Sequence, residues 1–214
     1  WLAPWAGVET EALPRRRLAL EGRLPERLRG ALFRNGPARH ELAGFRYRHW
    51  FDGDGMVHAW RLDDAGVTHE ARMVRTEKYV AETGAGRPLY PAFDTPVDDP
   101  RPLAGPDSVN VANISVLPRG DDLWALWEAG SPWLLDADTL ETRGIHTFSA
   151  ASRGLPFSAH PRVEPDGTLW NFGYASGAGR LVFWHVAADG RLLRVRTLPV
   201  DPMTMPHDFV VTAR

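Results

Sequence analysis

Short strand-like segments recur along the chain, and tight turns separate them. The segments are rich in aromatic and branched aliphatic residues, as in 45–50 and 168–174, and Asp-Gly pairs stand between several of them. Such runs predict β-strands, because Gly and Asp supply the backbone conformations that tight hairpins need. No longer segment shows a helical period, apart from a single turn at 25–29. A chain of many short strands without helices predicts an all-β sandwich, barrel or propeller.

The clearest expected hairpin joins residues 45–50 to residues 56–62. The sequence DGDG (52–55) lies between them, and its glycines are expected to supply the positive φ of the turn. A second turn is expected at 63–66, with one or two further strands over 67–79.

The rest of the chain begins with a loop rich in Pro, Gly and Asp, expected over 82–107. Further strands are expected at 109–117, 123–128, 133–135, 168–174, 181–186 and 192–198. Asp-Gly turns between successive strands favour up-and-down meanders, which are the topology of a propeller blade. No clean internal repeat is present, so these observations leave propeller and sandwich both open.

The chain contains no cysteine. Disulfides, zinc ribbons, thiolate nucleophiles and iron–sulfur clusters are therefore excluded, and any metal must be held by histidine, carboxylate or carbonyl oxygen. The absence of cysteine is also compatible with a reducing cytoplasm, where we expect the protein to be located. No apolar run approaches the roughly 18 residues that a membrane-spanning helix needs.

The formal net charge of −2 at pH 7 argues against nucleic acid as the main partner. The first fifty residues are more basic, with ten arginines and five glutamates. That excess, which includes Arg15, Arg16 and Arg17, is either an ordinary solvated surface or the basis of a transient contact with an anionic membrane face.

Eight histidines are spread along the chain without any His-x-His or His-x-x-x-His pair, so a metal site would have to be assembled from distant strands. His160 precedes Pro161, which favours an extended backbone and predicts His160 at the start or edge of a strand. His207 alternates with Phe209 and Val211, so in a strand it would share their apolar face and be neutral there. For each histidine, an ordinary structural role is the alternative.

Glu128 ends an apolar run and alternates with Trp124 and Leu126. A carboxylate on an apolar face costs free energy unless it is paired. An imidazole N–H would be a suitable partner, and this arrangement is common around metal-bound histidine. The alternative is that Glu128 lies at the solvated end of its strand.

Several motifs in series resemble the carotenoid cleavage oxygenases. In chain order they are GALFRNGP (30–37), HWFDGDGM (49–56), RMVRT (72–76), NVAN (110–113), LWE (126–128), SAHP (158–161) and HDF (207–209). The resemblance runs from about Trp1 to the end of the chain, and the motifs follow the family's order. The chain is therefore identified as the N-terminal part of a member of this family.

The resemblance implies a seven-bladed β-propeller, of which residues 1–214 would be a single partial domain with about three blades. It also implies iron(II) held on the propeller axis by four histidines. His160 and His207 match two of these ligands, and Glu128 matches a glutamate that orients another ligand ring. The remaining ligands would lie beyond Arg214, so the chain alone is expected to be inactive.

The implied activity is the oxidative cleavage of a conjugated carbon–carbon double bond, so the expected partners are an apolar small molecule and dioxygen. In the stilbene-cleaving branch, a tyrosine and a lysine hold a phenol. Tyr79 could serve as that tyrosine and contact the substrate, but Val109 stands where the lysine is expected. This difference favours a carotenoid or apocarotenoid substrate over a stilbene.

Two other functions stay open at the level of sequence. A non-catalytic propeller used as a binding module would need no further histidines facing its axis. A lactonase-like hydrolase built on the Asp166-Gly167 turn would need clustered carboxylates at one mouth of the channel, whereas the same turn is also an ordinary hairpin.

Overall fold

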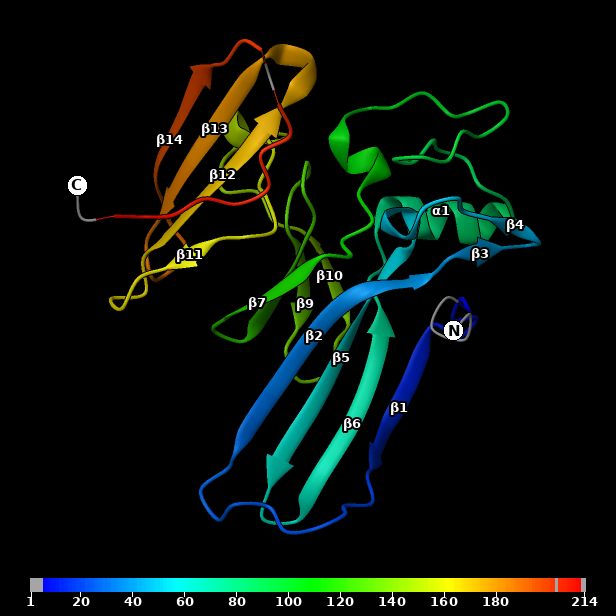
Figure 1. The fold of residues 1–214 in the computed structure, drawn as a ribbon, viewed down its shortest axis with the longest axis vertical. Coiled ribbons are helices and arrows are strands. Elements are labelled where there is room, and N and C mark those ends of the chain that lie inside the picture. The colour runs from blue at the N-terminus through cyan, green and yellow to red at the C-terminus, as the bar shows by residue number, and fades with distance from the viewer. Residues whose placement is uncertain (1–5, 203, 213–214) are drawn as a thin grey trace.

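The fold is built almost entirely from antiparallel sheets. The computed structural model describes residues 6–202 and 204–212. Three four-stranded sheets follow one another along the described chain, accompanied by a short two-stranded hairpin (Figure 1). The α-helix of the described part, α1, spans Glu77–Ala85. The all-β class predicted from the sequence is therefore confirmed.

The first sheet has the strand order β1-β6-β5-β2. Its strands are β1 (Ala12–Arg17), β2 (Gly30–Arg39), β5 (Asp54–Asp63) and β6 (Gly66–Met73). The separate hairpin consists of β3 (Glu41–Leu42) and β4 (Phe45–Arg46). The turn predicted at 63–66 is confirmed, because Asp63 lies opposite Gly66 where β5 and β6 meet.

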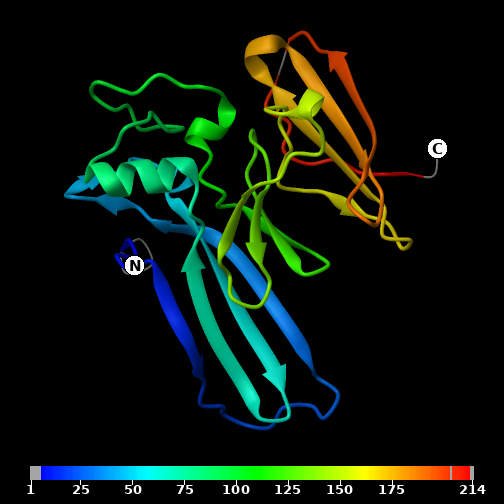
Figure 2. The same ribbon diagram turned by 180° about the vertical axis from the view of Figure 1, so that it is seen from behind.

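The second and third sheets are simple meanders, and in the third sheet Asp-Gly turns join β11 to β12 and β13 to β14. The second contains β7 (Ser115–Arg119), β8 (Asp122–Leu126), β9 (Trp133–Asp136) and β10 (Thr142–Ile145). The third contains β11 (Arg162–Val163), β12 (Leu169–Ala175), β13 (Arg180–Val186) and β14 (Leu192–Pro199). Short 3-10 helices lie in the connections, namely η2 (Trp50–Asp52), η3 (Pro106–Val109), η4 (Ala150–Ser152) and η5 (Ser176–Ala178). Figure 2 shows the same succession of sheets from behind.

The hairpin predicted between residues 45–50 and 56–62 is wrong. Strand β5 pairs instead with β2, so that Met56 lies opposite Gly36, while Phe45–Arg46 pairs with β3. The β2 segment contains Asn, Gly and Pro, which are depleted in strands, so local propensity conceals this partner.

The glycines of the 52–55 sequence also have a different role from the predicted one. Gly53 has a φ of −67°, so it supplies no positive φ. At Gly55, an added Cβ would lie 2.2 Å from the carbonyl oxygen of Ala112. Glycine is needed there because the backbone around Ala112 comes too close to leave room for a side chain.

Helix α1 replaces the strand and loop predicted for its region. It begins after Thr76, whose hydroxyl accepts a hydrogen bond from the Tyr79 N–H at 3.1 Å, and it ends at Gly86 with a φ of +64°. The buried residues of α1 are Lys78, Tyr79 and Glu82. Because two of them are charged, the sequence shows no apolar period typical of a helix. Neither α1 nor any other helix in the described residues has the length and apolar character needed to span a membrane.

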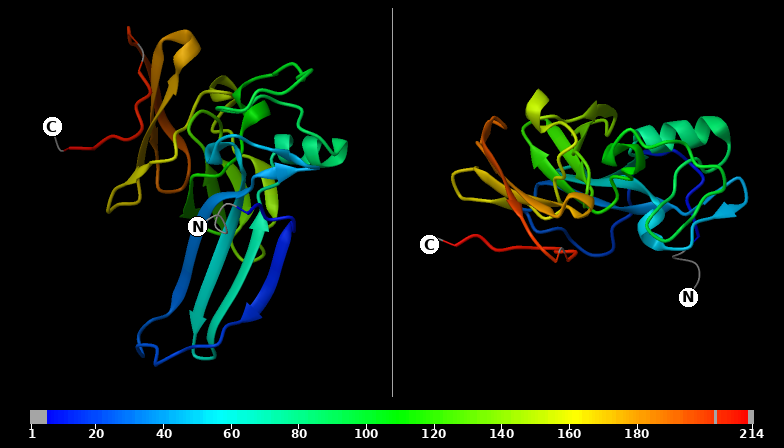
Figure 3. Two further views of the ribbon diagram at one scale, coloured as in Figure 1. Left: turned by 45° about the vertical axis from the view of Figure 1, so that its right-hand side comes forward. Right: turned by 90° about the horizontal axis from the view of Figure 1, so that it is seen from above.

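The second sheet lies between the other two (Figure 3). Its strand β8 contributes side chains to both cores. Leu123 belongs to the core that includes Val57 of β5. Trp124 belongs to the opposite core, which includes Trp184 of β13. Successive side chains of a strand point to opposite faces. By this alternation Glu128, which follows β8, is directed toward the third sheet.

Candidate metal centre

Glu128 lies two residues beyond the end of β8, where the second sheet approaches the third. Its side chain is 16% exposed, and among the described residues neither carboxylate oxygen has a hydrogen-bond partner. Burial raises the pKa of Glu128, although the nearby His207 opposes this rise. A buried carboxylate without hydrogen bonds costs free energy unless a cation is close. Positive charge would therefore be stabilising at this point.

His160 lies just before Pro161 and β11, in agreement with the strand start predicted from the sequence. Ser158 anchors this segment to β12, because its backbone N–H donates to the Phe172 carbonyl at 2.8 Å. The Nε2 atom of His160 is buried and has no hydrogen-bond partner in the part of the chain that the structure describes. Burial, followed by the proximity of His207, lowers the pKa of His160. A neutral imidazole is favoured, and it can offer a ring nitrogen to a metal.

His207 lies in the segment 204–212, which belongs to no helix or strand. The apolar strand face predicted for it with Phe209 and Val211 is therefore wrong, and 68% of the His207 side chain is exposed. The physical reason is that no strand of the described residues pairs with this segment. Phe209 still packs inward, with its ring centroid 5.3 Å from that of Phe172 in β12.

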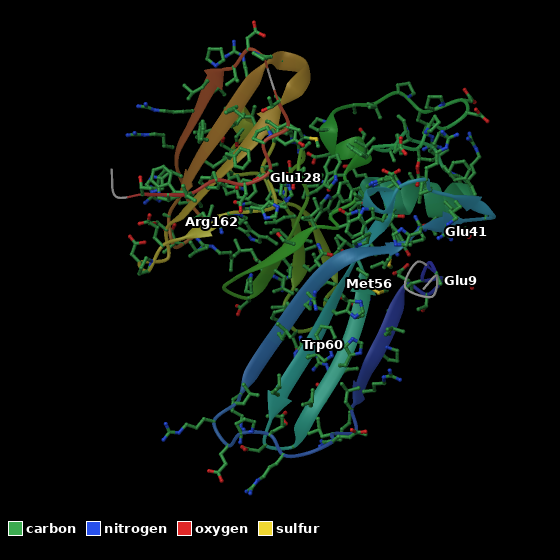
Figure 4. The ribbon with its side chains drawn as sticks, viewed as in Figure 1. Glu9, Glu41, Met56, Trp60, Glu128 and Arg162 are labelled. Atoms are coloured by element: carbon green, nitrogen blue, oxygen red, sulfur yellow. The ribbon has the colours of Figure 1, made fainter. Side chains whose placement is uncertain are left out.

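These three side chains converge, although they come from segments far apart in the sequence. One ligand atom from each of Glu128, His160 and His207 lies within 4.8 Å of the other two, and this is the one group of at least three such side chains in the described residues. Oε1 of Glu128 lies 3.0 Å from Nδ1 of His207 and 3.4 Å from Nε2 of His160. The two imidazole ring centroids are 4.3 Å apart. Figure 4 shows Glu128 between the second and third sheets.

The donor set of this group fits a divalent transition metal, because imidazole nitrogen and carboxylate oxygen are suitable ligands for iron and its neighbours. The contact of 3.0 Å between Glu128 and His207 lacks hydrogen-bond alignment, which is why both carboxylate oxygens remain unpaired. A bound cation would satisfy them. Two arrangements are compatible with the distances. Glu128 either binds the metal directly or holds Nδ1 of His207 while the opposite ring nitrogen faces the metal.

Tyr79, the predicted substrate contact, lies in α1 and is 4% exposed. It belongs to the core of the first sheet with Met56, Ala71 and Met73. The Arg39 guanidinium lies 4.2 Å over the Tyr79 ring, and burial raises the pKa of the phenol. None of these contacts involves the candidate metal centre, so a contact between Tyr79 and substrate stays a prediction.

Arg162 and Asp208, which the sequence did not indicate as candidate site residues, join two segments of the centre. The Arg162 guanidinium donates to both carboxylate oxygens of Asp208, at 2.7 and 2.6 Å. A basic residue two positions after His160 and an acidic residue directly after His207 are the available signal. The signal is weak, because only the fold brings residues 46 positions apart into contact.

Antiparallel four-stranded sheets and a cluster of imidazole and carboxylate groups define an all-β protein with a candidate metal centre assembled from distant segments. The family model described as retinal pigment epithelial membrane protein (RPE65) matches residues 5–214. The chain belongs to this family, which is that of the carotenoid oxygenases. The resemblance identified from the sequence motifs is therefore confirmed.

Individual relatives agree with this assignment. The apocarotenoid-15,15'-oxygenase of Synechocystis is 34% identical over 210 residues, which cover 90% of this chain and 42% of that protein. The lignostilbene-alpha,beta-dioxygenase isozyme III of Sphingomonas paucimobilis is 31% identical over 200 residues, covering 91% and 40%. The structure of the cobalt-substituted Synechocystis apocarotenoid oxygenase matches with a TM-score of 0.77 and 30% identity, covering 94% of this chain and 45% of that one. The chain thus spans less than half the length of the curated relatives that it matches.

Proposed function

We propose that the protein containing this chain is a non-haem iron(II) dioxygenase that cleaves a conjugated carbon–carbon double bond of a carotenoid or apocarotenoid into two carbonyl products. The convergence of Glu128, His160 and His207 carries this proposal. Relatives named as an apocarotenoid oxygenase and a dioxygenase support the reaction class. The cobalt-substituted relative supports a metal-dependent reaction.

We also propose that residues 1–214 form part of one seven-bladed propeller domain, in which the three four-stranded sheets are consecutive blades. Three blades of seven are about 43% of such a ring, close to the 42% of the Synechocystis relative that the chain covers. Two further histidine ligands then come from outside this chain.

The residues of the chain have separate tasks in this reaction. Iron(II), when bound, supplies the position at which dioxygen is activated. His160 and His207 would each offer a ring nitrogen to the metal. In the second arrangement given above, Nδ1–H of His207 would donate to Glu128, whose Oε1 lies 3.0 Å away, once the two groups are aligned. Such a hydrogen bond would fix the tautomer and leave the opposite nitrogen available for the metal. The ring pair of Phe172 and Phe209 gives the centre an apolar neighbour, which limits access of water.

We propose that the protein is located in the cytoplasm, with at most a transient contact between its basic N-terminal region and an anionic membrane surface. Arg15 lies in ion pairs with Glu70 and Asp138. Arg39 is buried against Asp54. Part of the basic excess is thus neutralised within the protein itself. This favours an ordinary solvated surface over a membrane-binding one for the N-terminal region.

Glu128→Gln in the full-length protein is expected to weaken iron binding by about 10–100-fold while the protein folds normally. The amide keeps the shape of the side chain but lacks the charge that polarises the histidine. Iron affinity is measured by competition with a chelator, and folding by circular dichroism. The matched control is Glu164→Gln, which changes a half-buried carboxylate outside the centre and should leave iron binding unchanged. Wild-type iron affinity in Glu128→Gln would remove this residue from the centre.

The substrate class is tested by incubating the iron-loaded full-length protein with an apocarotenoid and, separately, with a stilbene under air. We expect two carbonyl products from the apocarotenoid, identified by chromatography and mass spectrometry. Stilbene cleavage is the second candidate, because the Sphingomonas relative is 31% identical to this chain. Cleavage of the stilbene alone would reverse the assignment. Iron binding without cleavage of either compound would favour a binding module.

A further inference from the structure

We infer that the ion pair between Arg162 and Asp208 is a clamp that sets the position of His207 relative to His160. This inference rests on the proposed metal centre. Arg162 follows His160 by two residues, and Asp208 directly follows His207. The pair therefore joins the two histidine-bearing segments close to the histidines themselves, and Arg162 and Asp208 act as positioning residues.

The clamp has a directional geometry. One guanidinium nitrogen of Arg162 donates to both carboxylate oxygens of Asp208, at 2.7 and 2.6 Å. The Nε–H of Arg162 donates to the carbonyl oxygen of Phe209 at 3.1 Å. A planar guanidinium that contacts a carboxylate and the adjacent backbone fixes direction as well as distance, whereas a lysine ammonium would supply only a point charge.

The segment 204–212 depends on such side-chain contacts. It belongs to no strand or helix, so no ladder of backbone hydrogen bonds fixes its distance from β11. Its other described contacts include the ring pair of Phe209 with Phe172 and the approach of His207 to Glu128. The phenylalanine pair holds the segment over β12, and the Arg162 contacts join its backbone and side chains to β11.

The solvent exposure of Arg162 and Asp208 limits what their ion pair can contribute to stability. The side chains of Arg162 and Asp208 are 46% and 48% exposed, so their pairing adds little to the stability of the whole protein. The effect is local, because the clamp favours the 4.3 Å separation of the His160 and His207 rings. Ligands held in place before binding lose less conformational entropy when the metal arrives, so they bind it more tightly.

The test measures Co²⁺ affinity of the metal-free full-length protein by calorimetry, together with its melting temperature. In Arg162→Ala and in Asp208→Ala, we expect Kd to rise about tenfold, while Tm changes by less than about 2 °C. The reversed pair, Arg162→Asp with Asp208→Arg, should recover part of the affinity, because both charges are present again while the donor to the Phe209 carbonyl is lost. Arg143→Ala removes an arginine that is also 46% exposed and ion-paired, and it should leave Kd unchanged.

The outcomes separate the clamp from the metal centre. A wild-type Kd in both alanine variants, or an equal loss of affinity in Arg143→Ala, would overturn the clamp and leave the centre intact. A wild-type protein that binds no Co²⁺ would overturn the proposed metal centre and the clamp with it. If an alanine variant does not fold, Arg162→Lys and Asp208→Asn replace the pair. Each should show an intermediate Kd, and a wild-type Kd in both would overturn the clamp.

Discussion

Replacing His160 or His207 with alanine in the full-length protein is expected to abolish iron retention, and double-bond cleavage with it. Each substitution removes a ligand nitrogen from a group whose ligand atoms lie within 4.8 Å of one another. Each also leaves Glu128 with less compensation for its buried charge. Iron per protein chain, measured by elemental analysis after purification, should fall to less than about a tenth of the wild-type value.

The matched control is His185→Ala. His185 lies in β13 of the third sheet, where its ring stacks on Trp170 with centroids 3.8 Å apart, and it lies outside the candidate centre. Its replacement should cost some stability without loss of iron. Normal iron content and turnover in His160→Ala or His207→Ala would remove that histidine from the centre. Loss of iron in His185→Ala as well would show that folding, and not ligation, is being measured.

Much of the second and third sheets could be predicted from local sequence. Segments such as 169–175 and 180–186 are rich in apolar and aromatic residues, and Asp-Gly turns lie before the first of them, at 166–167, and after the second, at 189–190. The first sheet was harder to predict, because β2 carries residues that strands usually avoid and pairs with β5 across a long connection. Helix α1 was concealed for a related reason, since charged side chains occupy its buried face.

The candidate centre, too, could be predicted from local sequence only in part. Motifs in the sequence indicate Glu128, His160 and His207 as candidate residues, and the fold brings all three together. The surroundings of His207 could not be predicted, because a period of two describes a strand only where a neighbouring strand exists to pair with it. Arg162 was missed because its contact with Asp208 is purely tertiary.

Lys78, the single lysine of the chain, is fully buried on the inner face of α1. Its Nζ lies 2.7 Å from Oε2 of Glu82, 3.0 Å from the hydroxyl of Tyr47 and 3.5 Å from Oδ1 of Asp54. Burial acts to lower the pKa of Lys78, but attraction to Asp54 and its other neighbours outweighs burial and raises the pKa. Burial likewise acts to raise the pKa of Glu82, and Lys78 outweighs it so that the pKa is lowered. Both groups are therefore charged at neutral pH.

These directions fix how the pair responds to pH. Because the pKa of Glu82 is lowered by folding, its ionised form stabilises the fold above the unfolded value, about 4.3, and this contribution is lost as pH falls through the folded value. The raised pKa of Lys78 gives a contribution that is fully present below about 10.4 and is lost as pH rises through the folded value. Stability from this pair should be constant near neutral pH and decline in acid.

Lys78→Met is expected to lower the free energy of unfolding of the full-length protein by about 3–5 kcal/mol, measured by urea denaturation. The methionine fills a similar volume but leaves Glu82 and Asp54 buried without their shared cation. Combining Lys78→Met with Glu82→Gln removes one charge of each sign. The glutamine can still accept the backbone N–H of Leu89, which Glu82 now accepts at 2.9 Å, so the double variant should recover most of the loss.

An exposed ion pair provides the control for the Lys78 measurement. Arg23 and Glu26 are 88% and 89% exposed, so Arg23→Met should change the free energy of unfolding by no more than about 0.5 kcal/mol. Lys78→Met and Arg23→Met each remove one positive charge, so the difference between their free energies of unfolding reports the effect of burial. A loss below about 1 kcal/mol in Lys78→Met would mean that water reaches the buried carboxylates and compensates for the missing ammonium. The same reasoning predicts that Glu82→Gln alone, which leaves Lys78 with Asp54 as its remaining carboxylate, should cost less than Lys78→Met.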